Sequence, residues 1–153
     1  MRKQNGFSLI ELLIVVAIIL IIAAIAVPNL LRSRRAANEA SAVTSVRTIT
    51  SAEITYSASY PSVGYTCDLL HLGPYTGGPS ESAAGLIDEV LASGSKSNYQ
   101  FAITGCTGTP APSFFVSAVP KPGGVRKFCS DTSGILRYDP GSGDCTVASV
   151  PLQ

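Results

Sequence analysis

Hydrophobic and polar positions divide the chain into three stretches with different patterns. In the first stretch, sixteen consecutive apolar residues run from Leu12 to Val27, and the apolar character continues to Leu31. The segment 7–31 would form a helix of roughly 37 Å, at about 1.5 Å per residue. A hydrocarbon core is about 30 Å thick, so the first stretch predicts a helix that can span a membrane with some tilt.

The second stretch, residues 32–60, predicts an amphipathic helical half. Apolar side chains recur there every three or four residues, which is the spacing of one helical face. They are Ala36, Ala40, Val43, Val46, Ile49, Ala52, Tyr56 and Tyr60. Glu39, Arg47 and Glu53 lie between them, and the many β-branched residues lower helicity, so this half needs a partner surface. The helix should stop near Tyr60, because Pro61 disfavours helical geometry in the residue before it.

Pro28 lies inside what would otherwise be one continuous helix from residue 7 to residue 60. Proline cannot donate a backbone hydrogen bond, and its ring crowds the preceding turn. Such a break is tolerated near a membrane boundary or where neighbouring helices satisfy the freed carbonyl. The sequence therefore predicts a kink at Pro28.

The third stretch, residues 61–153, is rich in Gly, Pro, Ser and Thr and predicts a turn-dense β domain. Residues 86–91 could form one or two helical turns ended by Gly94. Residues 114–116 have the pattern of a strand buried on both faces, and residues 131–134 suit a tight hairpin with glycine in the left-handed position. About four strands are expected, at residues 99–104, 113–119, 125–130 and 134–138. The expected fold class is α+β, with an antiparallel sheet laid on the amphipathic half of the helix.

Four cysteines, Cys67, Cys106, Cys129 and Cys145, all follow the apolar stretch. They contain no Cys-x-x-Cys pair, which disfavours zinc, and two disulfides would stabilise a small domain. Disulfides need an oxidising compartment, which places residues 32–153 outside the cytoplasm. Three pairings are possible; Cys67–Cys106 with Cys129–Cys145 is favoured, because the second pair would tie the end of the chain to the sheet.

Charge and composition disfavour several functional classes. The net charge is +1, and without Arg2 and Lys3 the chain has 9 basic and 10 acidic side chains, so there is no overall electrostatic footprint for nucleic acid. The basic residues 32, 34 and 35 fit lipid headgroups, with DNA contact as the alternative. His71 is interpreted as a half-buried loop residue, and residues 139–144 as a turn, with a calcium loop as the alternative. No catalytic motif, metal site or cofactor site is found, so an enzyme is not expected.

The junction Gly6-Phe7-Ser8-Leu9-Ile10-Glu11 joins a basic leader, residues 1–6, to the apolar stretch. A carboxylate at a bilayer centre costs on the order of 2.5–3.5 kcal/mol on insertion scales, so Glu11 needs a reason. Cleavage after Gly6 would create an amine on Phe7, about 6 Å of helix rise from Glu11. The alternatives are a carboxylate that snorkels to the headgroups and an ordinary signal peptide cut near residues 24–26. The second alternative leaves Glu11 unexplained.

This junction resembles the signature of type IV prepilins. The resemblance implies that a prepilin peptidase cuts between Gly6 and Phe7, that the nitrogen of Phe7 is methylated, and that Glu11 pairs with the amine of a neighbouring subunit during assembly. Pilins commonly have a proline at the place of Pro28. They often have a glycine where this chain has Leu20, which is a departure from the family pattern.

The resemblance implies a structural subunit of a type IV pilus, serving adhesion, twitching motility or DNA uptake. A pseudopilin of a type II secretion system is the alternative; two disulfides favour the pilus, since pseudopilin heads more often rely on calcium. A signal-anchored periplasmic enzyme or binding protein is a third class. The implied partners are copies of the chain and related pilins, the prepilin peptidase, an assembly platform with its ATPase, and lipid before assembly. The implied location is the bacterial inner membrane with a cytoplasmic N-terminus, then an extracellular pilus or a periplasm-spanning filament.

Overall fold

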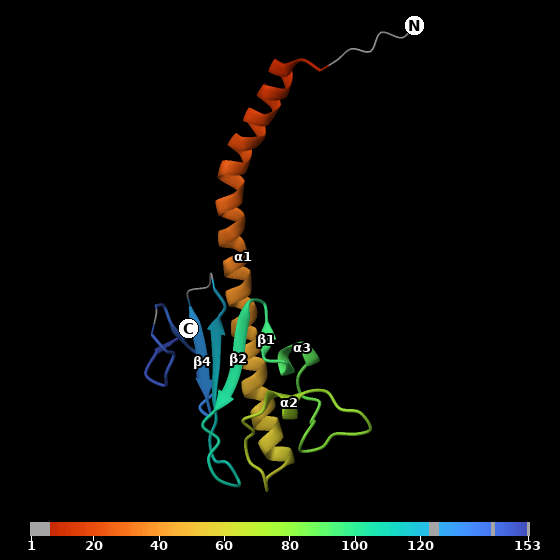
Figure 1. The fold of residues 1–153 in the computed structure, drawn as a ribbon. Coiled ribbons are helices and arrows are strands. Elements are labelled where there is room, and N and C mark those ends of the chain that lie inside the picture. Colours follow the sequence, from red (N-terminus) through yellow and green to blue (C-terminus); the bar gives the residue numbers. More distant parts are fainter. Residues whose placement is uncertain (1–6, 123–125, 142, 153) are drawn as a thin grey trace. The chain divides into compact units, whose positions relative to one another are not determined.

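The structure, a computed structural model, describes residues 7–122, 126–141 and 143–152. The chain divides into two compact units, Met1–Ala37 and Asn38–Gln153, and we call the second unit the head. The helix α1 (Leu9–Ser59) contributes residues to both units (Figure 1). The leader with Gly6 lies outside the described residues, and so does residue 125, where the third expected strand begins.

The helix α1 covers both the expected spanning segment and the expected amphipathic half. It ends at Ser59, next to the predicted end, because Pro61 follows two residues later and disfavours helical geometry at Tyr60. Pro28 lies inside α1, and helix is assigned on both sides of it. The kink expected at Pro28 stays a prediction.

Within the head, α1 buries one face against the other elements. The buried face begins at Ala42 rather than at Ala36, and Ala40 is exposed. The sheet and the short helices form the core cluster with α1 only from Ala42 onward, so the first two apolar positions of the predicted face have no cover. The buried positions are Ala42, Ser45, Val46, Ile49, Thr50, Ala52, Glu53 and Tyr56.

The head contains an antiparallel sheet with its strands in chain order, β1 to β6, which confirms the α+β class (Figure 1). The number of strands is six rather than about four, because two-residue strands at each edge are too short to show an alternating pattern. The strands are β1 (Ser95–Lys96), β2 (Tyr99–Thr104), β3 (Phe115–Pro120), β4 (Lys127–Asp131), β5 (Arg137–Asp139) and β6 (Val150–Pro151).

Strand β2 has the predicted bounds, and its buried residues Tyr99, Phe101 and Ile103 alternate with exposed ones. It pairs with β3 over its whole length, from Tyr99 opposite Pro120 to Thr104 opposite Phe115. The expected burial of residues 114–116 on both faces is only partly right. Phe115 is half-buried, because successive side chains of a strand point to opposite faces and its side lies away from the core.

Two four-residue helices lie between α1 and the sheet in the sequence, α2 (Leu69–Leu72) and α3 (Glu89–Ala92). The expected helix over residues 86–91 is therefore shorter and later. Asp88 stops it from starting earlier, since its extended backbone and its carboxylate, which accepts the Leu91 N–H at 2.9 Å, make it the N-cap. Asp68 caps α2 in the same way through the N–H of Leu70.

The core of the head lies between α1, the sheet and the short helices. Its largest fully buried members include Tyr56 of α1 and Tyr99 of β2, and both place their hydroxyl groups on backbone carbonyls. Tyr56 donates to the carbonyl of Glu81 at 2.6 Å, and Tyr99 donates to that of Arg126 at 3.0 Å. These bonds let a buried aromatic ring keep a satisfied polar end.

Two disulfides close the loops of the head, Cys67–Cys106 and Cys129–Cys145, the pairing that the sequence favoured. The first joins the connection after α1 to the loop after β2, and the second joins β4 to the segment before β6. The turn after β4 has the expected chemistry: Gly134 has a φ of 72°, and its N–H donates to the carbonyl of Asp131 at 2.9 Å.

Candidate assembly segment

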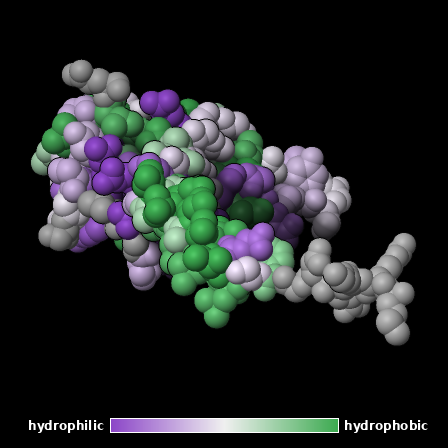
Figure 2. Space-filling model, turned by 90° about the horizontal axis from the view of Figure 1, so that it is seen from above, coloured by the Kyte–Doolittle hydropathy of each residue, from purple (hydrophilic) through white to green (hydrophobic). Residues whose placement is uncertain are grey.

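The apolar part of α1 is exposed along its whole described length. Every residue from Phe7 to Leu31 is exposed, apart from the half-buried Ala23. Apolar side chains, drawn in green, cover the visible face of this segment in Figure 2. By length and composition α1 is a candidate membrane span near the N-terminus. Soluble monomers rarely expose more than a few hundred Å² of contiguous apolar surface, so this segment requires cover by lipid or by other protein chains.

The helical conformation suits both kinds of cover. A helix satisfies its backbone hydrogen bonds internally, which a chain in hydrocarbon must do. At the start of α1 the N–H of Leu12 donates to the carbonyl of Ser8 at 3.2 Å. The four N–H groups of the first turn leave a partial positive charge at that end, which favours a nearby carboxylate.

Glu11 lies in this first turn and is exposed. It is the single charged residue between Phe7 and Leu31. Among the described residues, no ion pair involves its carboxylate. The helix end offers only part of a positive charge, so a full cation would have to come from outside the described part of the chain. Phe7, where the expected amine would form, is 78% exposed.

The basic residues Arg32, Arg34 and Arg35 follow the apolar segment on α1 and are exposed. None of them forms an ion pair within the described ranges. Long cationic side chains at the end of an apolar helix can reach a headgroup layer while their methylene groups remain in apolar surroundings. The interpretation as a lipid-facing patch therefore stays a prediction.

Two minor candidates in the head have ordinary structural surroundings. His71 lies in the last turn of α2 rather than in a loop; it is half-buried, and its Nδ1 lies 3.2 Å from the hydroxyl of Thr66. Asp139, the last residue of β5, accepts the N–H of Gly141, and Asp144 in the following loop pairs with Lys127 at 2.8 Å. In the described residues no group of three or more His, Cys, Asp or Glu side chains is placed to hold a metal ion.

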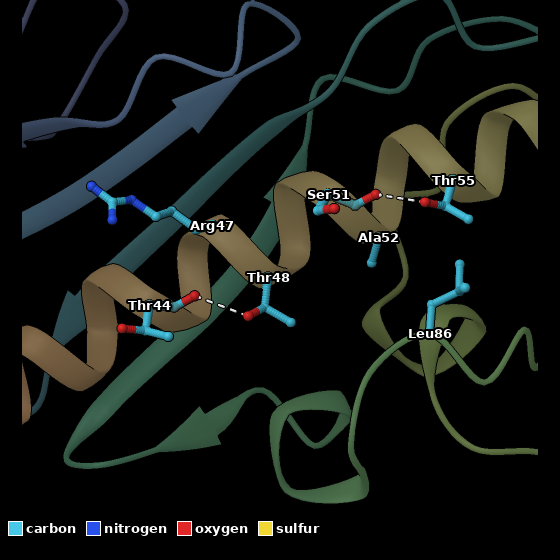
Figure 3. Close-up of a pocket in the computed structure, with 7 residues that line it drawn as sticks. All are labelled: Thr44, Arg47, Thr48, Ser51, Ala52, Thr55 and Leu86. Carbon is cyan, nitrogen blue, oxygen red and sulfur yellow. Dashed lines mark hydrogen bonds between the residues drawn. The ribbon is translucent and has the colours of Figure 1, made fainter.

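The exposed face of α1 in the head has a shallow recess of about 380 Å³ beside Leu86 (Figure 3). Its polar lining is mostly hydroxyl groups that are already occupied. Thr48 donates to the carbonyl of Thr44, and Thr55 donates to that of Ser51, each at 3.0 Å. These bonds to the preceding turn remove the hydroxyl hydrogens from use by a ligand.

Glu53 is the residue that the sequence interpretation misplaced. The sequence pattern predicts a polar position of the amphipathic half for Glu53, yet Glu53 is 0% exposed and lies in the buried face of α1. The signal was present in the spacing, because Glu53 follows Ile49 by four residues and precedes Tyr56 by three, which puts all three on one face. The charge of a glutamate favours an exposed position, whereas the spacing of Glu53 from Ile49 and Tyr56 favours a buried one.

Comparisons with known proteins include one that is located in this N-terminal region. Residues 1–27 match the model of the prokaryotic N-terminal methylation motif. Over 39 residues, the chain is 62% identical to the type IV wide pilus major component PilA4 of Thermus thermophilus, which is 26% of this chain and 30% of that protein. Over 46 residues, it is 48% identical to the type II secretion system core protein G of Vibrio cholerae, which is 30% of this chain and 32% of that protein.

The chain is therefore homologous to a type IV pilin and to a type II secretion protein, and residues 1–27 carry the prepilin motif. The chain spans about a third of the length of the curated relatives that it matches. No solved structure matches the chain. The family model thus covers most of the candidate assembly segment and stops before the head.

Proposed function

We propose that this chain is a structural subunit of a type IV pilus filament, assembled through the apolar segment of α1. The observation that carries the proposal is the exposed apolar segment Phe7 to Leu31 with its single charge at Glu11. The prepilin motif over residues 1–27 and the similarity to a pilus component over 39 residues support the proposal. A structural role needs no catalytic residues.

The proposed processing provides a cation for Glu11, which has no ion-pair partner among the described residues. Cleavage between Gly6 and Phe7 gives Phe7 a free amine at the N-terminal end of α1. In the filament, the amine of one subunit pairs with Glu11 of its neighbour, and this pairing sets the axial register of the two helices. Methylation of the amine by the same peptidase leaves its positive charge in place.

The apolar side chains provide cohesion between subunits. Removal of apolar surface from water contributes roughly 25 cal/mol per Å². Moving the helix from lipid into the filament gains little by this route, because lipid is already apolar. Assembly therefore requires an energy source, and the proposed partners are an inner-membrane platform and its ATPase, acting on a precursor held in the bilayer.

The proposed orientation places the leader in the cytoplasm and the head outside it. The two disulfides of the head, Cys67–Cys106 and Cys129–Cys145, support this orientation because they require an oxidising compartment. The mature protein then lies in an extracellular pilus, which functions in adhesion, twitching motility or DNA uptake.

A pseudopilin of a type II secretion system is the second candidate function. The similarity to core protein G of Vibrio cholerae over 46 residues supports it. In that case the filament is short, spans the periplasm and moves folded proteins outward.

Isolation of the mature protein from cells that produce it tests the proposal. We expect sheared cell-surface fibres composed mainly of this chain, with an N-terminal sequence that starts at a methylated Phe7. Deletion of the gene should then remove the fibres and leave protein secretion intact. Retained secretion cargo with intact surface fibres would instead select the second candidate, and an uncleaved, monomeric protein would reject both.

A further inference from the structure

Glu53 is a buried carboxyl group without a cation. It is 0% exposed and lies on α1 between Ile49 and Tyr56, whose side chains are also 0% exposed. Within the described ranges of the chain, no ion pair involves it. An isolated carboxylate in such surroundings is costly, and a buried acid without a partner normally becomes protonated instead.

The hydrogen bonds of Glu53 are incomplete. Its Oε2 accepts the backbone N–H of Thr66 at 3.0 Å, a bond between α1 and the connection that follows it. Its Oε1 and the nearby Thr50 Oγ1, one turn earlier on the same helix, are buried and have no hydrogen-bond partner among the residues that the structure describes. If the carboxyl group is protonated, Oε1 is an unpaired neutral polar group, which costs little free energy. If it is ionised, Oε1 carries an unsolvated charge, which costs more.

The bond to Thr66 connects Glu53 to a polar network at the surface. The hydroxyl of Thr66 lies 3.2 Å from Nδ1 of His71 and accepts the N–H of Asp68 at 3.1 Å. His71 Nε2 in turn lies 3.9 Å from the carboxylate of Asp68. Cys67, which forms the disulfide with Cys106, lies between Thr66 and Asp68 in the sequence.

In the described part of the chain, no lysine or arginine pairs with Glu53, so the ionisable groups around it provide no positive charge. Tyr56 follows Glu53 on α1, and the ring of Tyr60 lies beside that of Tyr56. Glu81 approaches Tyr56 from the loop before α3. His71 on α2 reaches Glu53 only through Thr66. Burial raises the pKa of Glu53 from 4.5 to about 7, and the hydrogen bond from Thr66 opposes this shift in pKa.

We propose that Glu53 is a pH-sensitive latch, which holds the segment 60–72 against α1 while its buried carboxyl group is protonated and loosens that segment when the group ionises. The charged form must obtain water for Oε1, and water can reach it only if the segment that carries Thr66 moves away from α1. The disulfide keeps the loosened segment attached to the sheet. The latch is a property of the head and does not depend on the proposed filament.

The sign of the effect follows from the two protonation states. The folded state keeps its proton at a higher pH than the unfolded chain, so the contribution of Glu53 to stability is complete below pH 4.5. It falls as the pH rises and is lost once the pH passes about 7. Because each pH unit between those values changes the folding equilibrium constant up to tenfold, the expected loss is on the order of 100-fold.

The test compares the full chain in detergent micelles with the variant Glu53→Gln, using unfolding followed by the near-ultraviolet circular dichroism of tyrosine between pH 4 and pH 8. Glu89→Gln is the matched control, because Glu89 is exposed in the first turn of α3. We expect the folding equilibrium constant of the wild-type protein to fall on the order of 100-fold relative to that of Glu53→Gln between pH 4.5 and pH 7. The control should follow the wild-type protein. A constant ratio between wild type and Glu53→Gln would overturn the proposal.

A second measurement on the wild-type protein covers the case in which Glu53→Gln does not fold. Carbon-13 NMR of the glutamate side-chain carboxyl groups should show one resonance that titrates well above the rest. Exchange of the Thr66 amide hydrogen, corrected for its intrinsic pH dependence, should accelerate through the same pH range. If all glutamates titrate in the ordinary carboxyl range, or if Thr66 stays equally protected, the latch does not exist.

Discussion

Glu11 and Glu53 belong to the same helix and lie in opposite surroundings. Glu11 is exposed in the first turn of α1, where the helix end favours negative charge. Glu53 is buried in the head, where burial favours the neutral acid. The same side chain can therefore serve intermolecular pairing at one position and respond to pH at the other.

Replacement of Glu11 by Gln tests its role in assembly. The substitution removes a charge that costs on the order of 2.5–3.5 kcal/mol at a bilayer centre, so insertion into the membrane should be retained. The pairing partner of the neighbouring amine is lost, so the yield of sheared filaments should fall at least tenfold. Cell fractionation and electron microscopy measure the two outcomes.

Glu11→Asp is the matched variant, since it keeps the charge on a shorter side chain. It should assemble better than Glu11→Gln. Normal filaments from Glu11→Gln would remove the assigned role of the charge, whereas loss of the protein from the membrane would place Glu11 in insertion instead of assembly.

Asp88 is a second residue whose contribution depends on charge. Its carboxylate accepts the N–H of Leu91 at 2.9 Å and pairs with Lys96 at 3.0 Å, and these contacts lower its pKa. Replacement by Ala should reduce the free energy of unfolding by about 1 kcal/mol at pH 7. Asp88→Asn, which keeps an acceptor for the cap, should lose less in the same denaturant titration.

The pH dependence of this loss has a definite sign. A carboxyl group with a lowered pKa stabilises the folded state above its ordinary titration range, and the contribution disappears as the pH falls through the lowered value. The difference between wild type and Asp88→Ala should therefore shrink toward pH 2. An undiminished difference at that pH would mean that the charge of Asp88 has no part in stabilising α3.

At the scale of elements, the connection after α1 is attached to the loop before β3 by its backbone. Gly64 forms a parallel bridge with Ala111, the N–H of Ala111 donates to the carbonyl of Val63 at 2.8 Å, and that of Tyr65 donates to the carbonyl of Ala111 at 3.2 Å. The close approach needs a residue without a side chain. A Cβ on Gly64 would lie 2.3 Å from the carbonyl oxygen of Ala111.

Replacement of Gly64 by Ala should therefore destabilise the head by at least about 2 kcal/mol, because φ at this position is +79° and the clash is with backbone. Gly141→Ala is the matched control, since its Cβ would meet Asp139 at an ordinary 3.8 Å. The control should change the free energy of unfolding by less than about 0.5 kcal/mol. Equal free energies of unfolding for the two variants in urea titration would show that the backbone at Ala111 can shift at little cost.

The elements differ in how far their residue patterns predict them. Strand β2 has three buried positions in strict alternation, so its type and bounds follow from the sequence. Strands β1 and β6 have two residues each, and only pairing with β2 and β5 makes them strands. The start of α3 was decided by the Asp88 cap, which competed with an apolar pattern that begins at Leu86.

At the scale of the whole molecule, the two compact units depend on different sources of stability. The head has its own core, two disulfides and a paired sheet. The apolar segment of the N-terminal unit is exposed and depends on material outside the chain for cover. The head can therefore keep its fold when the cover of the apolar segment changes from lipid to other protein chains.

A fragment that begins at Asn38 should accordingly remain soluble and monomeric in water and keep both disulfides, because all members of the core cluster follow this residue. The chain from Phe7 to the C-terminus should require detergent or should polymerise, because it exposes the apolar segment. Sedimentation velocity and circular dichroism compare the two. A fragment that unfolds or aggregates would show that the head needs the N-terminal unit for its own stability.

The sequence by itself determined the features that depend on local pattern. Sixteen apolar residues in a row require a helix in an apolar environment, whatever the rest of the chain does, and the charge at Glu11 stands out against them. The tertiary structure alone decided which face of α1 is covered, because burial depends on where the sheet and the short helices end. It therefore placed Glu53 in the core, since a residue's type does not reveal what packs over it.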